Sequence, residues 1–116
     1  MRFLANIHEP FYEFNDKKYI RIVVPEKIVS IIVSMQEKKK HLIQNPFVDD
    51  PLDGNILRVK IPYRYRRCMC KVEGLTPVEG MERGAAVDVD VSFAGVWNRG
   101  EHSGYAWKVD WIKNVD

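Results

Sequence analysis

The chain has 116 residues, of which 46% are apolar and 29% charged, ordinary values for one globular domain that argue against general disorder. The formal net charge is only +2, so this is not a polybasic chain, and any nucleic-acid role depends on where the charges lie. No run of about 18 apolar residues occurs and residues 1–10 lack a signal-peptide core, so we expect an intracellular protein, in the cytoplasm or a host cell, with no membrane partner.

The first half of the chain is predicted to form two strands and a helix. Residues 2–8 make the first strand, which Glu9-Pro10 ends, and Asn15-Asp16 marks a turn before the alternating strand at residues 18–24. Residues 25–43 favour a helix, with Pro25 in its first turn and a basic run near its end. Its β-branched content favours a strand as the alternative. The apolar residues at helical spacing are Ile28, Ile31, Ile32, Met35, Leu42 and Ile43.

The second half is predicted to be mostly β. Residues 44–55 are rich in Asn, Asp, Pro and Gly and should form an exposed acidic loop. Residues 56–72 indicate one long strand or two, with Pro62 at an edge or bulge, followed by a second loop at residues 73–84. The clearest strand covers residues 85–97. A connection at residues 98–104 and a return strand at residues 105–113 complete a hairpin.

The densest positive charge lies in residues 57–71, which contain no acidic residue. In a strand the odd positions would present apolar and aromatic side chains, including Tyr63 and Tyr65, and the even positions basic ones. Such a stripe suits a phosphate backbone, with tyrosines at its border stacking on bases. The alternative is a solvated outer face with both tyrosines in the core. The basic residues are Arg58, Lys60, Arg64, Arg66, Arg67 and Lys71.

The C-terminal hairpin carries a large share of the aromatic residues. One face of its return strand would present Tyr105, Trp107, Val109 and Trp111, and the other Ala106, Lys108, Asp110 and Ile112. Trp97 lies on the partner strand. Exposed tryptophans beside Arg99 and Lys108 would form a stacking platform, whereas the alternative places every ring in the core.

Catalytic and metal-binding patterns are weak. Asp88 and Asp90 could share a strand face and hold Mg²⁺, with Glu73, Glu79 or Glu82 as further ligands, although a polar outer face is the simpler interpretation. Cys68 and Cys70 are too close for an unstrained disulfide in an extended segment, and a zinc site would need more than the three distant histidines, so we expect free core thiols. No nucleophile motif or Gly-rich phosphate loop is present, and we expect neither an enzyme nor a cofactor.

The C-terminal half resembles a known family. Residues 75–93, a loop ending in glycine before a long alternating strand, resemble part of many OB-fold proteins. The segment SGYAWKV at residues 103–109 resembles the closing hairpin of small single-stranded DNA-binding proteins of phages and large DNA viruses, and residues 58–65 are similar to a basic strand in them. The resemblance covers about residues 56–113. The predicted helix stands earlier than in an ordinary OB-fold, where it lies between the third and fourth strands.

The resemblance implies a single OB-like domain over residues 1–116: mainly β with one helix (α+β), an OB-fold-like five-stranded antiparallel barrel or curved sheet. It implies largely sequence-independent binding of single-stranded DNA, or RNA in its place, in replication or recombination. A homodimer is a further partner, expected with the protein-interaction alternative. Alternatives are a protein-interaction or virion-associated structural module without nucleic-acid binding, and a metal-dependent nuclease using Asp88 and Asp90. The implied binding residues are Arg58, Lys60, Tyr63, Arg64, Tyr65, Arg66, Arg67, Lys71, Trp97, Arg99, Tyr105, Trp107 and Lys108.

Overall fold

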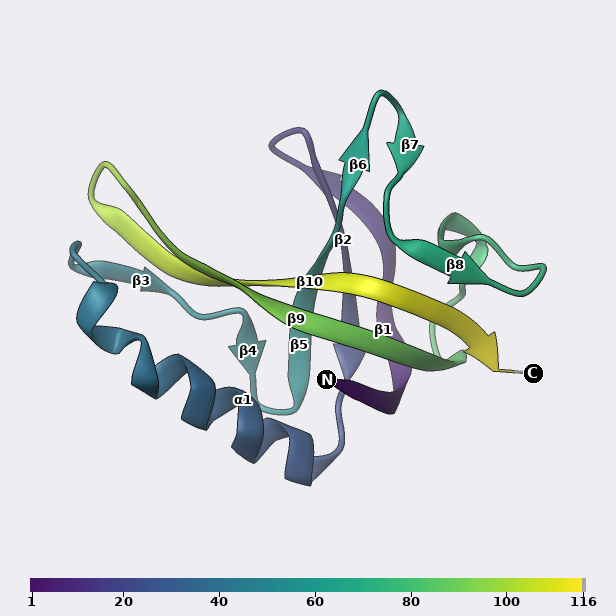
Figure 1. The fold of residues 1–116 in the computed structure, drawn as a ribbon, viewed down its shortest axis with the longest axis horizontal. Coiled ribbons are helices and arrows are strands. Elements are labelled where there is room, and N and C mark those ends of the chain that lie inside the picture. The colour runs from purple at the N-terminus through teal and green to yellow at the C-terminus, as the bar shows by residue number, and fades with distance from the viewer. Residues whose placement is uncertain (116) are drawn as a thin grey trace.

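Two N-terminal strands form the first hairpin (Figure 1). In the computed structural model, which describes residues 1–115, β1 (Arg2–Phe14) pairs antiparallel with β2 (Lys17–Val23). The predicted turn is confirmed: Asn15 and Asp16 have φ angles of 51° and 63°. Positive φ at both central residues is what a type I′ turn requires, and its twist matches that of the two strands.

β1 does not end at Glu9-Pro10, as the sequence predicted. Pairing with β2 shifts register between Ile7 and Glu9 and again between Glu9 and Tyr12, and then continues to Phe14. The dipeptide therefore lies in an irregular, bulged part of the strand, where proline removes no ladder hydrogen bond that the sheet needs.

The helix α1 (Glu26–Lys38) is shorter than predicted, because the chain leaves α-geometry after Lys38 and forms a 3₁₀ turn, η1 (Lys40–Leu42). Its buried side chains are Ile28, Ile32 and Gln36, a narrow stripe at four-residue spacing. The prediction of a wider buried apolar face for this segment is wrong, since Ile31, Met35 and Leu42 are exposed. Within residues 1–115, no helix is long and apolar enough to cross a membrane.

The segment predicted as an acidic exposed loop contains two short strands. β3 (Phe47–Asp49) pairs parallel with the C-terminal strand, and β4 (Leu52–Asp53) pairs antiparallel with β5 (Ile56–Ile61). These pairings hold Asp49 half-buried against the sheet, so this part of the segment is not a free loop.

The predicted long strand over residues 56–72 breaks after β5. Leu57, Val59 and Ile61 are fully buried, which confirms the alternation up to Ile61. Beyond Pro62, the strands β6 (Tyr63–Arg64) and β7 (Arg67–Cys68) form a separate two-stranded sheet, and β8 (Lys71–Glu73) follows. Tyr65 and Arg66, with φ angles of 54° and 62°, form the turn between β6 and β7 instead of continuing the alternation.

A long hairpin completes the chain, as predicted. After the 3₁₀ turn η2 (Val78–Gly80), β9 (Ala86–Arg99) pairs antiparallel with β10 (His102–Val115), so residues 102–104 belong to the strand and not to the connection. Val109 pairs with Val91 but Trp111 pairs with Asp90, which makes Asp110 an extra residue in a bulge.

The bulge corrects the predicted faces of β10. Because one extra residue reverses the alternation, Trp111 turns away from the side that Val109 faces and is only half-buried. Ile112 takes the inward position and is fully buried, although the simple alternation had placed it outward.

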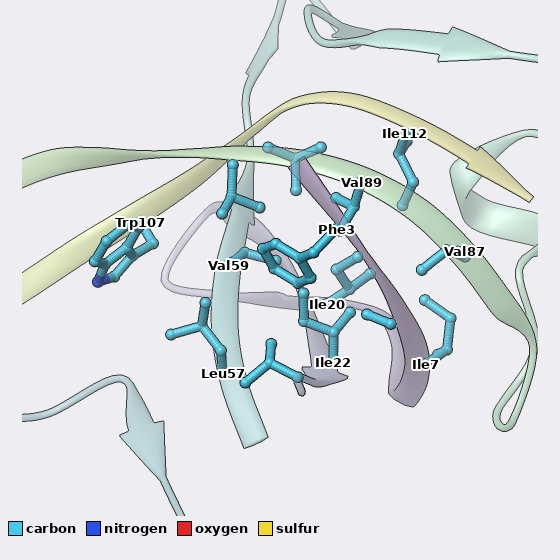
Figure 2. Close-up of a cluster of buried hydrophobic side chains, with 14 of the residues drawn as sticks. Phe3, Ile7, Ile20, Ile22, Leu57, Val59, Val87, Val89, Trp107 and Ile112 are labelled. Atoms are coloured by element: carbon cyan, nitrogen blue, oxygen red, sulfur yellow. The ribbon is translucent and has the colours of Figure 1, made fainter. Parts of the chain in front are cut away.

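The strands form one curved sheet in the order β3-β10-β9-β1-β2-β5-β4. A parallel pairing of Lys108 with Lys60 also connects β10 to β5, but only at that residue pair, so the sheet is not a closed barrel. Residues 1–115 are thus mainly β with one α-helix. Figure 2 shows the core on the concave side, where side chains such as Phe3, Ile22, Leu57, Val89 and Trp107 point towards one another from five strands.

One polar side chain anchors α1 to this core. Gln36 is 5% exposed, its Nε2 donates to Asp50 Oδ1 at 3.0 Å, and its Oε1 accepts from Trp107 Nε1 at 3.0 Å. Both ends of the amide are therefore satisfied, as a buried polar group requires. The contact ties together the helix, the segment before β4 and the centre of β10.

We expect Gln36→Met to lower the free energy of unfolding by about 1–3 kcal/mol, because it leaves the Trp107 indole N–H buried without an acceptor. Urea unfolding followed by tryptophan emission measures the loss. Glu37→Met, at the exposed neighbouring position, is the matched control and should change stability by less than about 0.5 kcal/mol. Equal effects of the two substitutions would contradict the anchoring role.

Candidate functional site

An open groove of about 1240 Å³ lies between the two long hairpins. Figure 1 shows the β1–β2 turn and the β9–β10 turn both projecting beyond the body of the sheet. Residues of the β1–β2 hairpin and of the β9–β10 hairpin line the groove, together with outward side chains of β5, Asp49 of β3 and Pro51. The side chains with aromatic or ionisable groups are Tyr12, Phe14, Asp16, Lys17, Tyr19, Asp49, Arg58, Lys60, Trp97, Arg99, His102, Tyr105 and Trp107.

The strand register places aromatic and basic side chains in one row across the sheet. Tyr12 pairs with Tyr19, Tyr19 with Lys60, and Lys60 with Lys108. Paired residues present their side chains on the same face, and this is the outer face because Val59 and Val109, their neighbours in the strands, are fully buried. The row starts in the groove and continues to Lys108, which is exposed.

The two tyrosines of this row are in contact. The Tyr12 and Tyr19 rings stack with centroids 5.6 Å apart at an interplanar angle of 29°, and the Arg58 guanidinium lies 5.7 Å from the Tyr19 ring centroid. Burial raises the pKa of both tyrosines above the ordinary value, so both phenols are neutral near pH 7. The groove therefore offers two flat, uncharged rings beside a cation.

Arg58 is held by a carboxylate inside the groove. Its Nη1 and Nη2 donate to Asp49 Oδ1 and Oδ2 at 3.2 and 2.6 Å. Burial by itself would lower the pKa of Arg58, but the hydrogen bonds and negative charge of Asp49 outweigh it and raise the pKa. Asp49 thus occupies the position that an anionic ligand oxygen would take at this guanidinium.

The β9–β10 hairpin contributes Trp97, Arg99 and His102. The Trp97 ring packs on the backbone of its pair partner Gly104, where an added Cβ would lie 2.7 Å from the indole and 2.8 Å from the Asp49 carbonyl oxygen. Trp97 is half-buried and keeps part of its ring towards the groove.

Two of the predicted stacking residues are buried instead. Tyr105 is 7% and Trp107 2% exposed, because both face the core side of β10, where Phe93 contacts them at centroid distances of 6.4 and 5.2 Å. Burial raises the pKa of Tyr105. Both residues line the groove from the core side of β10, and because their rings are buried, neither ring is free to stack on a base.

The rest of the predicted set lies outside the groove. Tyr63, Arg64, Tyr65, Arg66 and Arg67 belong to the β6–β7 hairpin, where Tyr65 is 89% exposed at the turn. The Tyr63 hydroxyl donates to the Glu79 carboxylate. Lys71 of β8 lies 4.0 Å from Glu73, and Lys108 lies 4.0 Å from Asp110.

A second hollow of about 390 Å³ lies beside the β6–β7 hairpin. It is lined by Lys60, Pro62, Tyr63, Arg64 and Met69. Since Lys60 lines both spaces, the hairpin adjoins the groove at this lysine, and Arg64 adds a positive charge beside it.

Sequence reasoning missed the first hairpin as a part of the site. Tyr12, Phe14, Lys17 and Tyr19 line the groove from both sides of the Asn15-Asp16 turn. The signal was present, since aromatic and basic residues cluster around a predicted two-residue turn. Which side of the sheet this turn would face depends on the register shifts in β1, which the sequence pattern did not reveal.

The two carboxylates considered for a metal site have cationic partners. Arg2 Nε and Nη2 donate to Asp88 at 3.0 and 2.8 Å, and these hydrogen bonds lower the pKa of Asp88, while the Met1 nitrogen donates to Asp90 at 2.9 Å. The Arg2 guanidinium also lies 4.2 Å from the Trp111 ring centroid. Among residues 1–115, no three His, Cys, Asp or Glu side chains gather in a way that could hold a metal ion.

No protein-family model matches this chain, and neither the curated proteins nor the solved structures include a significantly similar one. The function of the groove is therefore inferred from its own geometry and chemistry.

We expect Gly104→Ala to destabilise the protein by about 1–3 kcal/mol and to shift the emission of Trp97, because the new methyl group overlaps both the indole and the Asp49 carbonyl. Thermal unfolding and emission spectra measure the two effects. Gly80→Ala is the control, since its Cβ would meet only ordinary contacts at 3.6–3.7 Å. An unchanged spectrum in Gly104→Ala would contradict the packing described for Trp97.

Proposed function

We propose that the groove binds single-stranded DNA, largely without reading its sequence, as an accessory in replication or recombination. The observation that carries the proposal is the cross-strand row of Tyr12, Tyr19 and Lys60 on the floor of an open groove between two hairpins. Stacking rings beside cations are the combination that proteins use to hold a single strand.

The local charge supports contact with phosphates. The cations Lys17, Arg58, Lys60 and Arg99 line the groove, against the carboxylates of Asp16 and Asp49. A positive excess therefore gathers here although the whole chain has a net charge of only +2. Cations along a groove neutralise the backbone in a way that depends on salt and not on base sequence.

The aromatic side chains favour a single strand over a duplex. Tyr12, Tyr19 and Trp97 present ring faces or edges to the groove, and a base can stack on such a ring only after leaving its own base stack. Stacking does not distinguish DNA from RNA, and RNA is therefore compared directly in the binding experiment.

The arrangement of strands gives a further argument. In chain order the five longest strands are β1, β2, β5, β9 and β10. An OB-fold, a five-stranded and partly open Greek-key barrel, binds oligonucleotides over its second and third strands and the loops joining strands 1–2 and 4–5. The groove lies over β2 and β5, between the β1–β2 and β9–β10 turns. In one respect the chain departs from that pattern: α1 precedes the third of these strands.

We expect Lys60→Ala to weaken binding of a fluorescein-labelled oligo-dT several-fold and to reduce the salt slope by about 0.7, the loss of one phosphate contact to a single strand. Trp97→Ala should cost about 1–3 kcal/mol of binding free energy through lost stacking. Fluorescence anisotropy at about 50 and about 200 mM salt measures both. Lys27→Ala, on the exposed side of α1, is the charge-matched control.

Three results would count against the proposal. An absence of oligo-dT binding by the wild-type protein at low salt would reject it outright. An equal loss in Lys27→Ala would show that binding follows net charge and not the groove. Tighter binding of oligo-rU than oligo-dT would assign the groove to RNA.

We expect Asp49→Asn to tighten oligo-dT binding and to steepen its salt dependence, because the Arg58 guanidinium then becomes available to a phosphate. The same anisotropy titrations report the change, with urea unfolding to verify that the variant folds. Asp53→Asn removes a carboxylate that is 87% exposed and outside the groove, and it is the matched control. Weaker binding by a stable Asp49→Asn protein would mean that Asp49 orients Arg58 for the strand.

A protein-interaction module is the second candidate function, favoured by apolar side chains at the surface. Exposed apolar residues lie on α1, η1 and β3, and they are Ile31, Val33, Met35, Leu42, Phe47 and Val48. Exposed apolar surface on a strand at the sheet edge is typical of an interface between chains. Light scattering over a range of concentrations would detect a homodimer, which the DNA-binding proposal does not need.

A further inference from the structure

Cys68 and Cys70 lie in contact at the base of the β6–β7 hairpin. Their sulfur atoms are 3.1 Å apart and both thiols are free. Cys68 is half-buried, whereas Cys70 is buried at 9% exposure. The sequence had argued against a bond between them on the assumption of an extended segment, but the chain bends at Cys70 and brings the two sulfurs together.

The hairpin above them is short and rests on few contacts. Its ladder consists of the pairs Tyr63–Cys68 and Arg64–Arg67. Met69 N donates to the Pro62 carbonyl at 2.7 Å and closes its base. Cys68 and Met69 thus contribute directly to the bonds that set the orientation of the hairpin, and any change in the backbone of residues 68–70 must move it.

We propose that Cys68 and Cys70 are a redox-active dithiol, which a hydroperoxide converts reversibly to an intramolecular disulfide, and that this reaction repositions the β6–β7 hairpin. Because Arg64 of the hairpin lines the hollow next to Lys60, the reaction would alter how Arg64 meets a bound strand. This consequence for DNA rests on the function proposed above, whereas the disulfide and the hairpin movement do not.

The reaction takes two steps. The Cys68 thiolate attacks one oxygen of hydrogen peroxide, the O–O bond breaks, and hydroxide leaves and takes up the thiol proton as water, so that sulfur is oxidised to a sulfenic acid. Cys70 sulfur then attacks the Cys68 sulfur, its proton passes to the departing hydroxyl, and a second water leaves. Two thiols and one peroxide give one disulfide and two waters.

The environments of the two sulfurs suit this order. Cys68 is the more accessible and meets the oxidant first. Burial raises the pKa of Cys70 to about 12, and its hydrogen bond with Cys68 acts in the same direction, so Cys70 stays a protected thiol until a sulfenic acid forms beside it. Contact at 3.1 Å then favours closure over reaction with a free thiol from solution.

Closure must displace the backbone. Bonded sulfurs lie about 2 Å apart, closer than the present contact, and a ring through only Cys68, Met69 and Cys70 leaves little freedom to take up the change. The backbone movement would disturb the Met69–Pro62 hydrogen bond and the Tyr63–Cys68 strand pair. A bond under such constraint is readily reduced, which suits a reversible modification.

The chemistry is tested by mass spectrometry on the reduced, full-length protein treated with hydrogen peroxide and then with iodoacetamide. We expect loss of two hydrogen atoms, protection of both cysteines in one monomeric chain, and recovery of both thiols with dithiothreitol. In the Cys70→Ser variant the reaction should stop at the sulfenic acid of Cys68, because no second thiol is present to form the disulfide. Disulfide-linked dimers of the wild type, or a sulfinic Cys68 beside an alkylated Cys70, would overturn the proposal.

The hairpin movement is tested by limited trypsin digestion, because trypsin cleaves after Arg64, Arg66 and Arg67. We expect a several-fold change in the rate of cleavage at these sites when the wild type is oxidised, and none in the Cys68→Ser/Cys70→Ser variant. Identical rates in bridged and reduced protein would reject the movement.

The two proposals are separated by measuring oligo-dT affinity on the same samples. If oxidation changes cleavage at the trypsin sites but the reduced protein does not bind oligo-dT, the redox proposal stands and the DNA-binding function is rejected. Binding that remains unchanged by a verified bridge would reject the link between them and leave the DNA-binding function in place.

Discussion

The backbone hydrogen bonds of β10 hold the sheet together, because this strand pairs with β9, β3, β5 and β8. Its pairing with β9 shifts register after Ala106 and after Val109, and these irregularities let the hairpin curve around the core. The curvature carries the far end of the hairpin out beyond the sheet, where it forms one wall of the groove.

The core and the groove are connected through two consecutive acidic residues. Asp50 accepts the hydrogen bond from buried Gln36, which also accepts from Trp107, and so fixes the segment between α1 and β5. Asp49, the preceding residue, is thereby held against Arg58 inside the groove. The packing of the helix therefore sets the charge that a ligand would meet, although α1 contributes no side chain to the groove lining.

The register of the sheet determines which aromatic and basic side chains lie next to one another on the groove floor. Tyr12, Tyr19, Lys60 and Lys108 come from four strands and from distant parts of the sequence, yet pairing aligns them in one row. The β6–β7 hairpin meets this row at Lys60 and carries its arginines on a base made of two cysteines in contact. The proposed binding surface and the proposed dithiol thus adjoin at Lys60.

Local patterns of burial and turn formation could be predicted from the sequence alone. Alternation predicted which side chains of residues 57–61 and 87–91 face inward, and the turn residues predicted the Asn15-Asp16 turn and the final hairpin, because period-two burial and turn geometry depend on neighbours in the chain. The bulges on either side of Glu9 and at Asp110, the turn at Tyr65-Arg66, and the row that joins Tyr12 to Lys60 depend instead on tertiary contacts. Each of these depends on which strand lies alongside and at what register, an interaction between distant segments that no local pattern encodes.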